Sequence, residues 1–205
     1  RAADARGGCV RPVTVPGPST IVVAIGGNAL VHDGHESILD QLDAVERIAP
    51  SIASLVAGGH RVIVTHGNGP QVGYILRRSE LALGEVAPVP IDFAVADTQG
   101  AIGHMFLLAL RNELHRRGLD RPVTAVVTEV VVDAHDPAFA APSKPVGTLL
   151  ERARAQELAE RYGWSVVEDA GRGWRRVVAS PVPLQITERA AIGALVDAGH
   201  VVIAC

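Results

Sequence analysis

The sequence is short of cysteine and aromatic residues, and both shortages narrow what the chain can be. Its 205 residues include 2 cysteines, and 3% of them are aromatic. Cys9 and Cys205 stand near opposite ends, so we expect no structural disulfide and a reducing, cytoplasmic setting. With so few rings, Val, Ile, Leu and Ala must build the core. Such a composition suits a buried parallel sheet covered by helices.

The sequence also lacks an excess of charge of one sign and long apolar runs. Its formal net charge is -3, and acidic and basic residues are mixed along the chain. A nucleic-acid partner would require a basic surface, so we expect none. No apolar run approaches the roughly 18 residues of a membrane span, and no signal segment opens the chain. We therefore expect no membrane partner either.

Lysine is almost missing, since Lys144 is the only one and every other basic side chain is arginine or histidine. It stands in the segment PSKPVG, where Pro142 and Pro145 stiffen the backbone on both sides. A point cation held in this way suits a phosphoryl group in transfer, whose negative charge must be balanced. The alternative is a solvated loop lysine.

Apolar runs alternate with segments of helical periodicity, and this alternation predicts an α/β fold with a parallel sheet. Residues 1–19 show no periodicity and are predicted to be a disordered tail, with one domain over 20–205. The predicted strands are 21–25, 61–65, 123–132 and 201–204, and the predicted helices are 36–57, 71–83, 93–117 and 187–198.

The segment 133–180 interrupts this alternation and is predicted to be a small excursion from the main sheet. A Pro-rich loop leads to a polar helix, for which Thr148 and Glu151 predict a capping box and Gly163 an end. The runs 164–168 and 174–179 flank a glycine-containing loop and predict a hairpin.

Two of the predicted strands end in loops of similar character, GGN at 26–28 and HGNGP at 66–70. Parallel strands deliver such loops to one edge of the sheet, where open α/β sheets bind ligands. Glycines let backbone N–H groups approach an anion, and a helix starting at Gln71 adds its positive end. Asn28 and Asn68 offer uncharged donors. The pattern predicts a pocket for a small anion, although each loop alone is also typical of a tight turn.

Other polar residues give weaker signals. His66 is a candidate base or a packing residue, and Asp133 and Asp136 fit a metal site or a turn. The basic hairpin around Arg172 is either an anion contact or solvated, and Thr98–Gln99–Gly100 lines the cleft or packs. The remaining histidines show no metal-ligand spacing, so we expect no metal site.

Taken in order, seven motifs resemble the signatures of the carbamate kinases, over about residues 21–205: AIGGNAL, VTHGNGPQVG, DTQGAIGH, VVVDAHDPAF, SKPVG, EDAGRGWRRVVASPVP and AGHVVIAC. The resemblance implies the N-terminal part of the amino acid kinase fold, a three-layer α/β/α sandwich with a mainly parallel sheet, plus a protruding subdomain at about 133–180. It also implies a homodimer that transfers a phosphoryl group between MgATP and carbamate. The products are ADP and carbamoyl phosphate, and the ATP-forming direction belongs to arginine catabolism.

By the same resemblance, Gly26, Gly27, Asn28, Gly67, Asn68 and Gly69 surround carbamate and the phosphoryl group, and Lys144 is the catalytic cation. The family's C-terminal ATP-binding part has no counterpart here, so we expect this stretch alone to be inactive and prone to aggregation. Two alternatives stay open: a related kinase that phosphorylates an amino-acid carboxylate, and a non-catalytic remnant that binds anions or pairs with related subunits.

Overall fold

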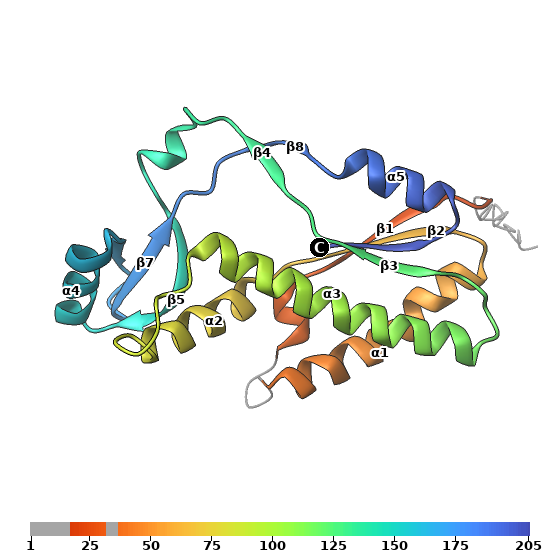
Figure 1. Cartoon of the computed structure of the whole chain (residues 1–205), viewed down its shortest axis with the longest axis horizontal. Helices are drawn as coiled ribbons and strands as arrows, with labels where there is room; N and C mark the ends of the chain where they lie inside the picture. The colour runs from red at the N-terminus through yellow and green to blue at the C-terminus, as the bar shows by residue number, and fades with distance from the viewer. Residues whose placement is uncertain (1–16, 32–36) are drawn as a thin grey trace, which may run out of the picture.

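The structure, a computed structural model, describes residues 17–31 and 37–205. Most of the predicted N-terminal tail therefore lies outside the described residues, as do Cys9, His32 and His35. A four-stranded main sheet stands at one end of the molecule and a smaller sheet at the other (Figure 1).

All neighbouring strands of the main sheet are parallel. The strands follow the predicted apolar runs closely, and the central strand β9 is buried on both faces, whereas the edge strand β1 alternates exposed and half-buried residues. In spatial order they are β1 (Thr20–Ile25), β2 (Arg61–His66), β9 (Val201–Ala204) and β3 (Val123–Val126).

Helices cover both faces of this sheet, which confirms the three-layer α/β/α prediction. Helices α1 (Ile38–Ala57) and α3 (Ile91–Arg116) pack on one face, and α5 (Arg189–Asp197) packs on the other. Alternation along β2 divides its side chains, since Val62 and Val64 join the larger core while Ile63 packs against the α5 cluster.

Short-range signals explain the ends of α1. Its N-cap is Ser37, which forms a capping box with Asp40, and the chain leaves the helix through Gly59 at a φ of 82°. The helix continues through Pro50. Gly26 is the N-cap of a short 3-10 helix, η1 (Gly27–Leu30), which was not predicted and which contains Gly27 and Asn28.

The prediction of one strand over 123–132 is wrong, because the run forms β3 and then β4 (Val130–Val132). Between them, the Gln99 side chain bonds both backbone groups of Thr128, and the Thr128 hydroxyl donates to the carbonyl of Cys205. These contacts end pairing with the main sheet. Strand β4 then pairs antiparallel with β8 (Pro183–Ile186), and the two form an arm (Figure 1).

Beyond the arm and the short helix η2 (Pro137–Phe139), three antiparallel strands and one helix form the smaller unit. The predicted hairpin is confirmed and consists of β6 (Ser165–Glu168) and β7 (Trp174–Val178). Strand β5 (Lys144–Leu150) pairs with β7, and α4 (Arg152–Tyr162) ends at Gly163 with a φ of 67°.

Two local predictions in this unit are wrong. Lys144 begins strand β5, opposite Val178, rather than standing in a loop. Thr148 also belongs to β5, and the N-cap of α4, Glu151, makes no side-chain cap bond, so the capping box does not form. Val146 and Leu150 pair with β7 on either side of Thr148, and this tertiary contact outweighs the local capping pattern.

The smaller unit rests on α2 (Gly69–Leu81), the helix that follows the second glycine loop. Val146 of β5 packs into an apolar cluster around Val72 and Leu76 of α2. One helix therefore connects the glycine loops at the sheet edge with the strand that carries Lys144.

Contrary to expectation, α3 is long and apolar enough to cross a membrane by length and composition. In this fold it is a core helix, because Ile102, Phe106 and Leu110 are fully buried between α1 and the sheet. Core helices of soluble folds share this composition.

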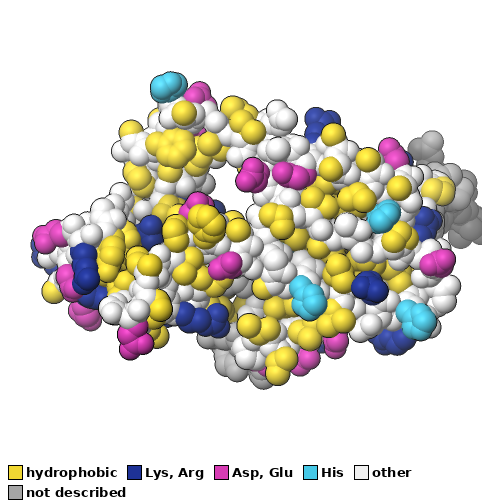
Figure 2. Space-filling model, viewed as in Figure 1, with side chains coloured by type: hydrophobic (Ala, Val, Ile, Leu, Met, Phe, Trp, Pro, Cys, Tyr) yellow, Lys and Arg dark blue, Asp and Glu magenta, His cyan; other side chains and the backbone are white. Residues whose placement is uncertain are grey.

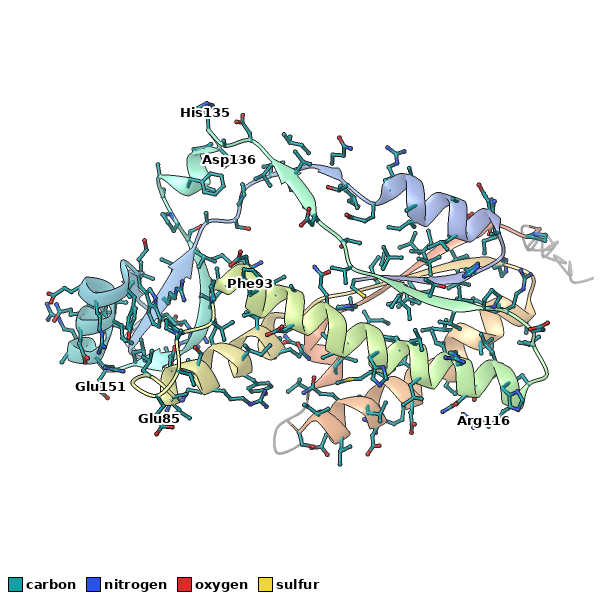
Figure 3. The ribbon with its side chains drawn as sticks, in the orientation of Figure 1. Glu85, Phe93, Arg116, His135, Asp136 and Glu151 are labelled. Atoms are coloured by element: carbon teal, nitrogen blue, oxygen red, sulfur yellow. The ribbon has the colours of Figure 1, made fainter. Side chains whose placement is uncertain are left out.

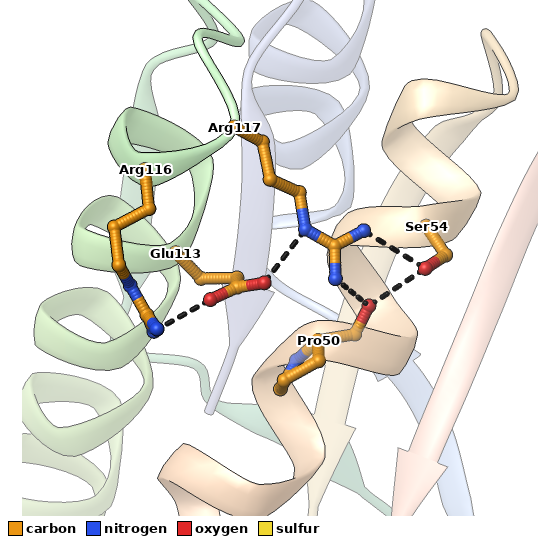
Figure 4. A network of polar contacts seen from close by, with 5 residues as sticks. All are labelled: Pro50, Ser54, Glu113, Arg116 and Arg117. Atoms are coloured by element: carbon orange, nitrogen blue, oxygen red, sulfur yellow. Dashed lines mark hydrogen bonds and ion pairs between the residues drawn. The ribbon is translucent and has the colours of Figure 1, made fainter.

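A buried carboxylate ties the end of α3 to α1 (Figure 4). The Glu113 side chain is 7% exposed and pairs with Arg116 at 2.5 Å and Arg117 at 2.6 Å. Arg117 also donates to the Ser54 hydroxyl and to the carbonyl of Pro50. Glu113 thus holds Arg117 in the position from which it bridges the two helices.

We expect Glu113→Ala to lower the free energy of unfolding by about 2–3 kcal/mol, because charge-assisted bonds in a shielded position are lost. Glu157→Ala is the matched control, since Glu157 forms a similar i,i+3 pair with Arg154 but is 52% exposed. Its cost should stay below about 0.5 kcal/mol. Urea denaturation measures both, and equal costs would contradict the bridging role.

Candidate functional site

The two glycine loops meet at the carboxyl edge of the main sheet. Strands β1 and β2 are in register up to Ile25 and His66, and the Gly67 N–H donates to the carbonyl of Ile25 at 2.8 Å. A Cβ atom on Gly67 would lie 2.8 Å from the backbone nitrogen of Gly27. A Cβ on Gly27 would lie 3.1 Å from the nitrogen of Asn68. These two glycines are therefore required by direct backbone packing between the loops.

Gly26 and Gly69 differ from this pair, since nothing lies within 4 Å of a Cβ built on either residue. Neither has a positive φ. Packing alone does not require glycine at these positions, and their backbone stays open to the surroundings.

A buried threonine orients Asn68. The Asn68 amide donates to the Thr98 hydroxyl at 3.0 Å, and that hydroxyl donates to the carbonyl of Val95 at 2.6 Å. Thr98 is 2% exposed, so the hydroxyl that accepts from Asn68 is shielded from water. Of the sequence segment 98–100, Thr98 supports the site and Gln99 fastens α3 to the turn after β3.

A cavity of about 880 Å³, here called the central cavity, lies between the glycine loops, the start of α3 and the smaller unit. Figure 2 shows the molecular surface hollowed beneath the arm. Of the seven predicted site residues, the cavity lining includes Asn28, Asn68, Gly69 and Lys144. Gly26, Gly27 and Gly67 are not in the lining.

The lining also contains Tyr74, Asp92, Phe139 and Arg175, which were not predicted as site residues. Arg175 comes from the basic hairpin GRGWRR, so the sequence did carry a signal for it. Its Nη1 lies 3.5 Å from a carboxylate oxygen of Asp169, and its Nε is buried without a partner among the described residues. Together with Lys144, it gives the cavity a second cation.

The hairpin's other arginines have structural contacts. Arg176 stacks on the Trp164 ring at 4.4 Å, and burial lowers the pKa of its guanidinium. Arg172 pairs with Asp169 at 2.7 Å.

The aspartates after β4 form turns and hold the arm. Asp133 accepts the N–H of His135, and Asp136 accepts the N–H groups of Ala138 and Val182. Those two backbone bonds lower the pKa of Asp136. Figure 3 shows His135 and Asp136 at the outer end of the arm, away from Phe93 at the start of α3. Within residues 17–31 and 37–205, no three His, Cys, Asp or Glu side chains group as a metal site.

His66 is packed rather than presented to the cavity. Its ring stacks on Phe106 with 6.4 Å between centroids, and its Nε2 is buried without a partner among the described residues. Burial lowers the pKa of His66, while its contact with the carbonyl of Gly67 opposes that shift. His66 does not line the central cavity. The geometry favours the packing interpretation over the base.

Comparison with known proteins agrees with the fold. Residues 19–205 match the sequence profile of the amino acid kinase family. The carbamate kinase of Pyrococcus horikoshii is 46% identical over 190 residues, covering 91% of this chain and 60% of that protein. The carbamate kinase-like protein YqeA of Escherichia coli is 49% identical, covering 89% of this chain and 58% of that protein.

A solved structure of Giardia lamblia carbamate kinase bound to AMP-PNP superposes with a TM-score of 0.83 and 37% identity, covering 92% of this chain and 60% of that one. The chain thus spans about 60% of the length of the relatives that it matches.

Gly67→Ala should lower the free energy of unfolding by about 1–3 kcal/mol, because its Cβ would meet the Gly27 backbone, which cannot move without shifting the loop. Gly69→Ala is the control, since it has open space and stands in the first turn of α2. We expect it to be neutral or slightly stabilising. Thermal unfolding decides; a Gly67→Ala protein as stable as Gly69→Ala would show that the loops do not depend on their contact.

His66 should remain mostly neutral at pH 6.5, where a free imidazole is half protonated. The unfolded chain then binds more protons than the folded one, so the contribution of His66 to stability is present above pH 6.5 and is lost as the pH falls below it. NMR titration of the ring carbons tests this. A midpoint at or above that of free histidine would exclude the buried neutral ring.

Proposed function

Since this chain belongs to the amino acid kinase family, we propose that it is the acceptor-binding part of a carbamate kinase. The proposed reaction transfers a phosphoryl group between ATP and carbamate and gives ADP and carbamoyl phosphate. The observation that carries the proposal is the central cavity, whose lining combines Asn28, Asn68 and Gly69 with Lys144, the chain's only lysine.

The groups in the cavity suit a reaction between two anions. Carbamate is already negatively charged, so its oxygen can attack the γ-phosphorus of ATP without a general base. The bond from phosphorus to the bridging oxygen breaks, and ADP leaves with that electron pair. Alignment and charge neutralisation are then the main requirements. Amides, open glycine backbone and a lysine provide both, and the packed position of His66 agrees with a mechanism that needs no base.

Each site residue has a proposed role. The first loop (Gly26, Gly27 and Asn28) and the second loop (Gly67, Asn68 and Gly69) are proposed to surround carbamate and the transferred phosphoryl group together. Lys144 reaches the transferred group from the smaller unit, which we propose to be the family's protruding subdomain over about 133–180. Gly27 and Gly67 contribute by allowing the two loops to touch rather than by contacting the ligand themselves.

The nucleotide belongs to a different part of the proposed enzyme. No group of metal ligands is found among residues 17–31 and 37–205. ATP or ADP with Mg²⁺ is proposed to bind in the family's C-terminal part. The whole protein is proposed to be a cytoplasmic homodimer. The Giardia relative that binds AMP-PNP supports the choice of an adenine nucleotide.

We expect Lys144→Ala to lower ATP formation from carbamoyl phosphate and ADP by about 10²–10³-fold in the full-length gene product, because one well-placed electrostatic donor is lost. Arg47→Ala is the control, since it removes an exposed cation of α1 outside the cavity. Unchanged turnover in Lys144→Ala would remove the lysine from the mechanism. If a substrate panel shows that glutamate or acetylglutamate is phosphorylated and carbamate is not, carbamate is the wrong substrate.

A further inference from the structure

Few polar side chains are buried in this core, and several of them surround the glycine loops. The buried polar residues among those described are Gln41, Gln71, Ser79, Thr98 and Glu113. Burying an amide costs free energy unless it is hydrogen-bonded, so an aliphatic core retains one only where its bonds are used. Thr98 orients Asn68, as described above. The other two residues near the loops, Gln41 and Gln71, are hydrogen-bonded to each other.

Gln71 joins three elements. It stands in the first turn of α2, and its side-chain nitrogen donates to the Gln41 side-chain oxygen at 3.1 Å and to the carbonyl of Gly27 at 3.4 Å. Gln41 belongs to α1 and Gly27 to η1, and η1 is in contact with both α1 and α2. Gln71 and Gln41 are 7% and 4% exposed, so water does not compete for these bonds.

The partners also fix which way the Gln71 amide faces. A backbone carbonyl can only accept hydrogen bonds, so the NH₂ group of Gln71 must point at Gly27. Its own carbonyl oxygen is buried without a partner among the described residues. In this orientation the side-chain oxygen of Gln71 accepts no hydrogen bond from the described residues, so the contribution of this amide is its donation to the loop.

The bond to Gly27 has a consequence on the other side of the same peptide. The chain contains no cis peptide in its described part, and the carbonyl and N–H of a trans peptide point in opposite directions. With the Gly27 carbonyl turned toward Gln71, the N–H of Asn28 is turned away from it. Asn28 lines the central cavity.

We propose that Gln71, held by Gln41, is a positioning residue that fixes the first glycine loop against the start of α2 and thereby sets the direction of the Asn28 N–H. This inference rests on the proposed function, since the loop is taken to bind carbamate and the phosphoryl group. Gln71 acts through the loop and does not touch the ligand itself.

The test compares Gln71→Met with Ser79→Ala in the full-length gene product. Methionine keeps the volume of Gln71 and removes its donor. Ser79 is a matched control, because it is a buried polar residue of the same helix that accepts a loop N–H, from Val89 at 2.8 Å, but lies at the far end from the glycine loops. Both variants should lose stability.

Only Gln71→Met should change catalysis. We expect kcat for ATP formation from carbamoyl phosphate and ADP to fall about 10–100-fold, since a small misplacement of a positioned group has effects of this size. KM for carbamoyl phosphate should rise, while KM for ADP stays within about twofold. If Gln71→Met loses stability as Ser79→Ala does but retains kcat and both KM values, Gln71 is merely structural and the inference is wrong.

A second variant covers the case in which Gln71→Met does not fold. In Gln71→Glu the new carboxyl can donate to Gly27 only when protonated. Its kcat relative to the wild type should therefore rise as the pH is lowered from 8 to 6, and a constant ratio would overturn the inference.

Amide exchange at Asn28, followed by NMR, separates this inference from the proposed function. Faster exchange in Gln71→Met than in Ser79→Ala supports the positioning role even if the wild type forms no ATP from carbamoyl phosphate. In that case the proposed function alone fails. Equal exchange in the two variants, together with normal wild-type activity, leaves the proposed function intact and rejects the role of Gln71.

Discussion

The close approach of two glycines at the end of neighbouring parallel strands is the contact on which the site depends. Gly67 and Gly27 pack backbone to backbone, because neither residue has a side chain to separate them. This contact puts Asn28 and Asn68 at one cavity, although helix α1 and strand β2 separate them in the chain. The parallel pairing of β1 with β2 brings the loops to the same edge. The absence of two Cβ atoms then decides how near they come.

Helix α2 extends this arrangement to the smaller unit. Its first turn follows the second glycine loop and carries Gln71, and further along it Val72 and Leu76 hold Val146 of β5. Lys144 stands two residues before Val146, so the position of the cation relative to the loops depends on how β5 packs against α2. The site is therefore assembled across two units of the fold rather than within one sheet, which agrees with the proposed role of the smaller unit in phosphoryl transfer.

Patterns that depend on neighbours in the chain gave accurate predictions, and patterns that compete with distant contacts did not. The strands of the main sheet follow from apolar runs, and the C-terminal ends of α1 and α4 follow from Gly59 and Gly163. The run 123–132 is uniformly β-branched, and nothing local marks its interruption at Thr128, which Gln99 and Cys205 cause from far along the chain. Thr148 carries a capping pattern, but Val146 and Leu150 on either side of it pair with β7 and carry the strand past it.

The sequence by itself determined the α/β fold and the two glycine loops, since these follow from periodicity and glycine content, and it singled out Lys144 by its rarity. Only the tertiary structure decided which glycines touch, that Thr98 orients Asn68, that Arg175 joins the cavity and that His66 is packed on Phe106. The physical reason is that burial and hydrogen bonding depend on residues 30 or more positions apart. Their mutual distance is set by how the sheet, α2 and the smaller unit pack, and no local pattern in the chain carries that information.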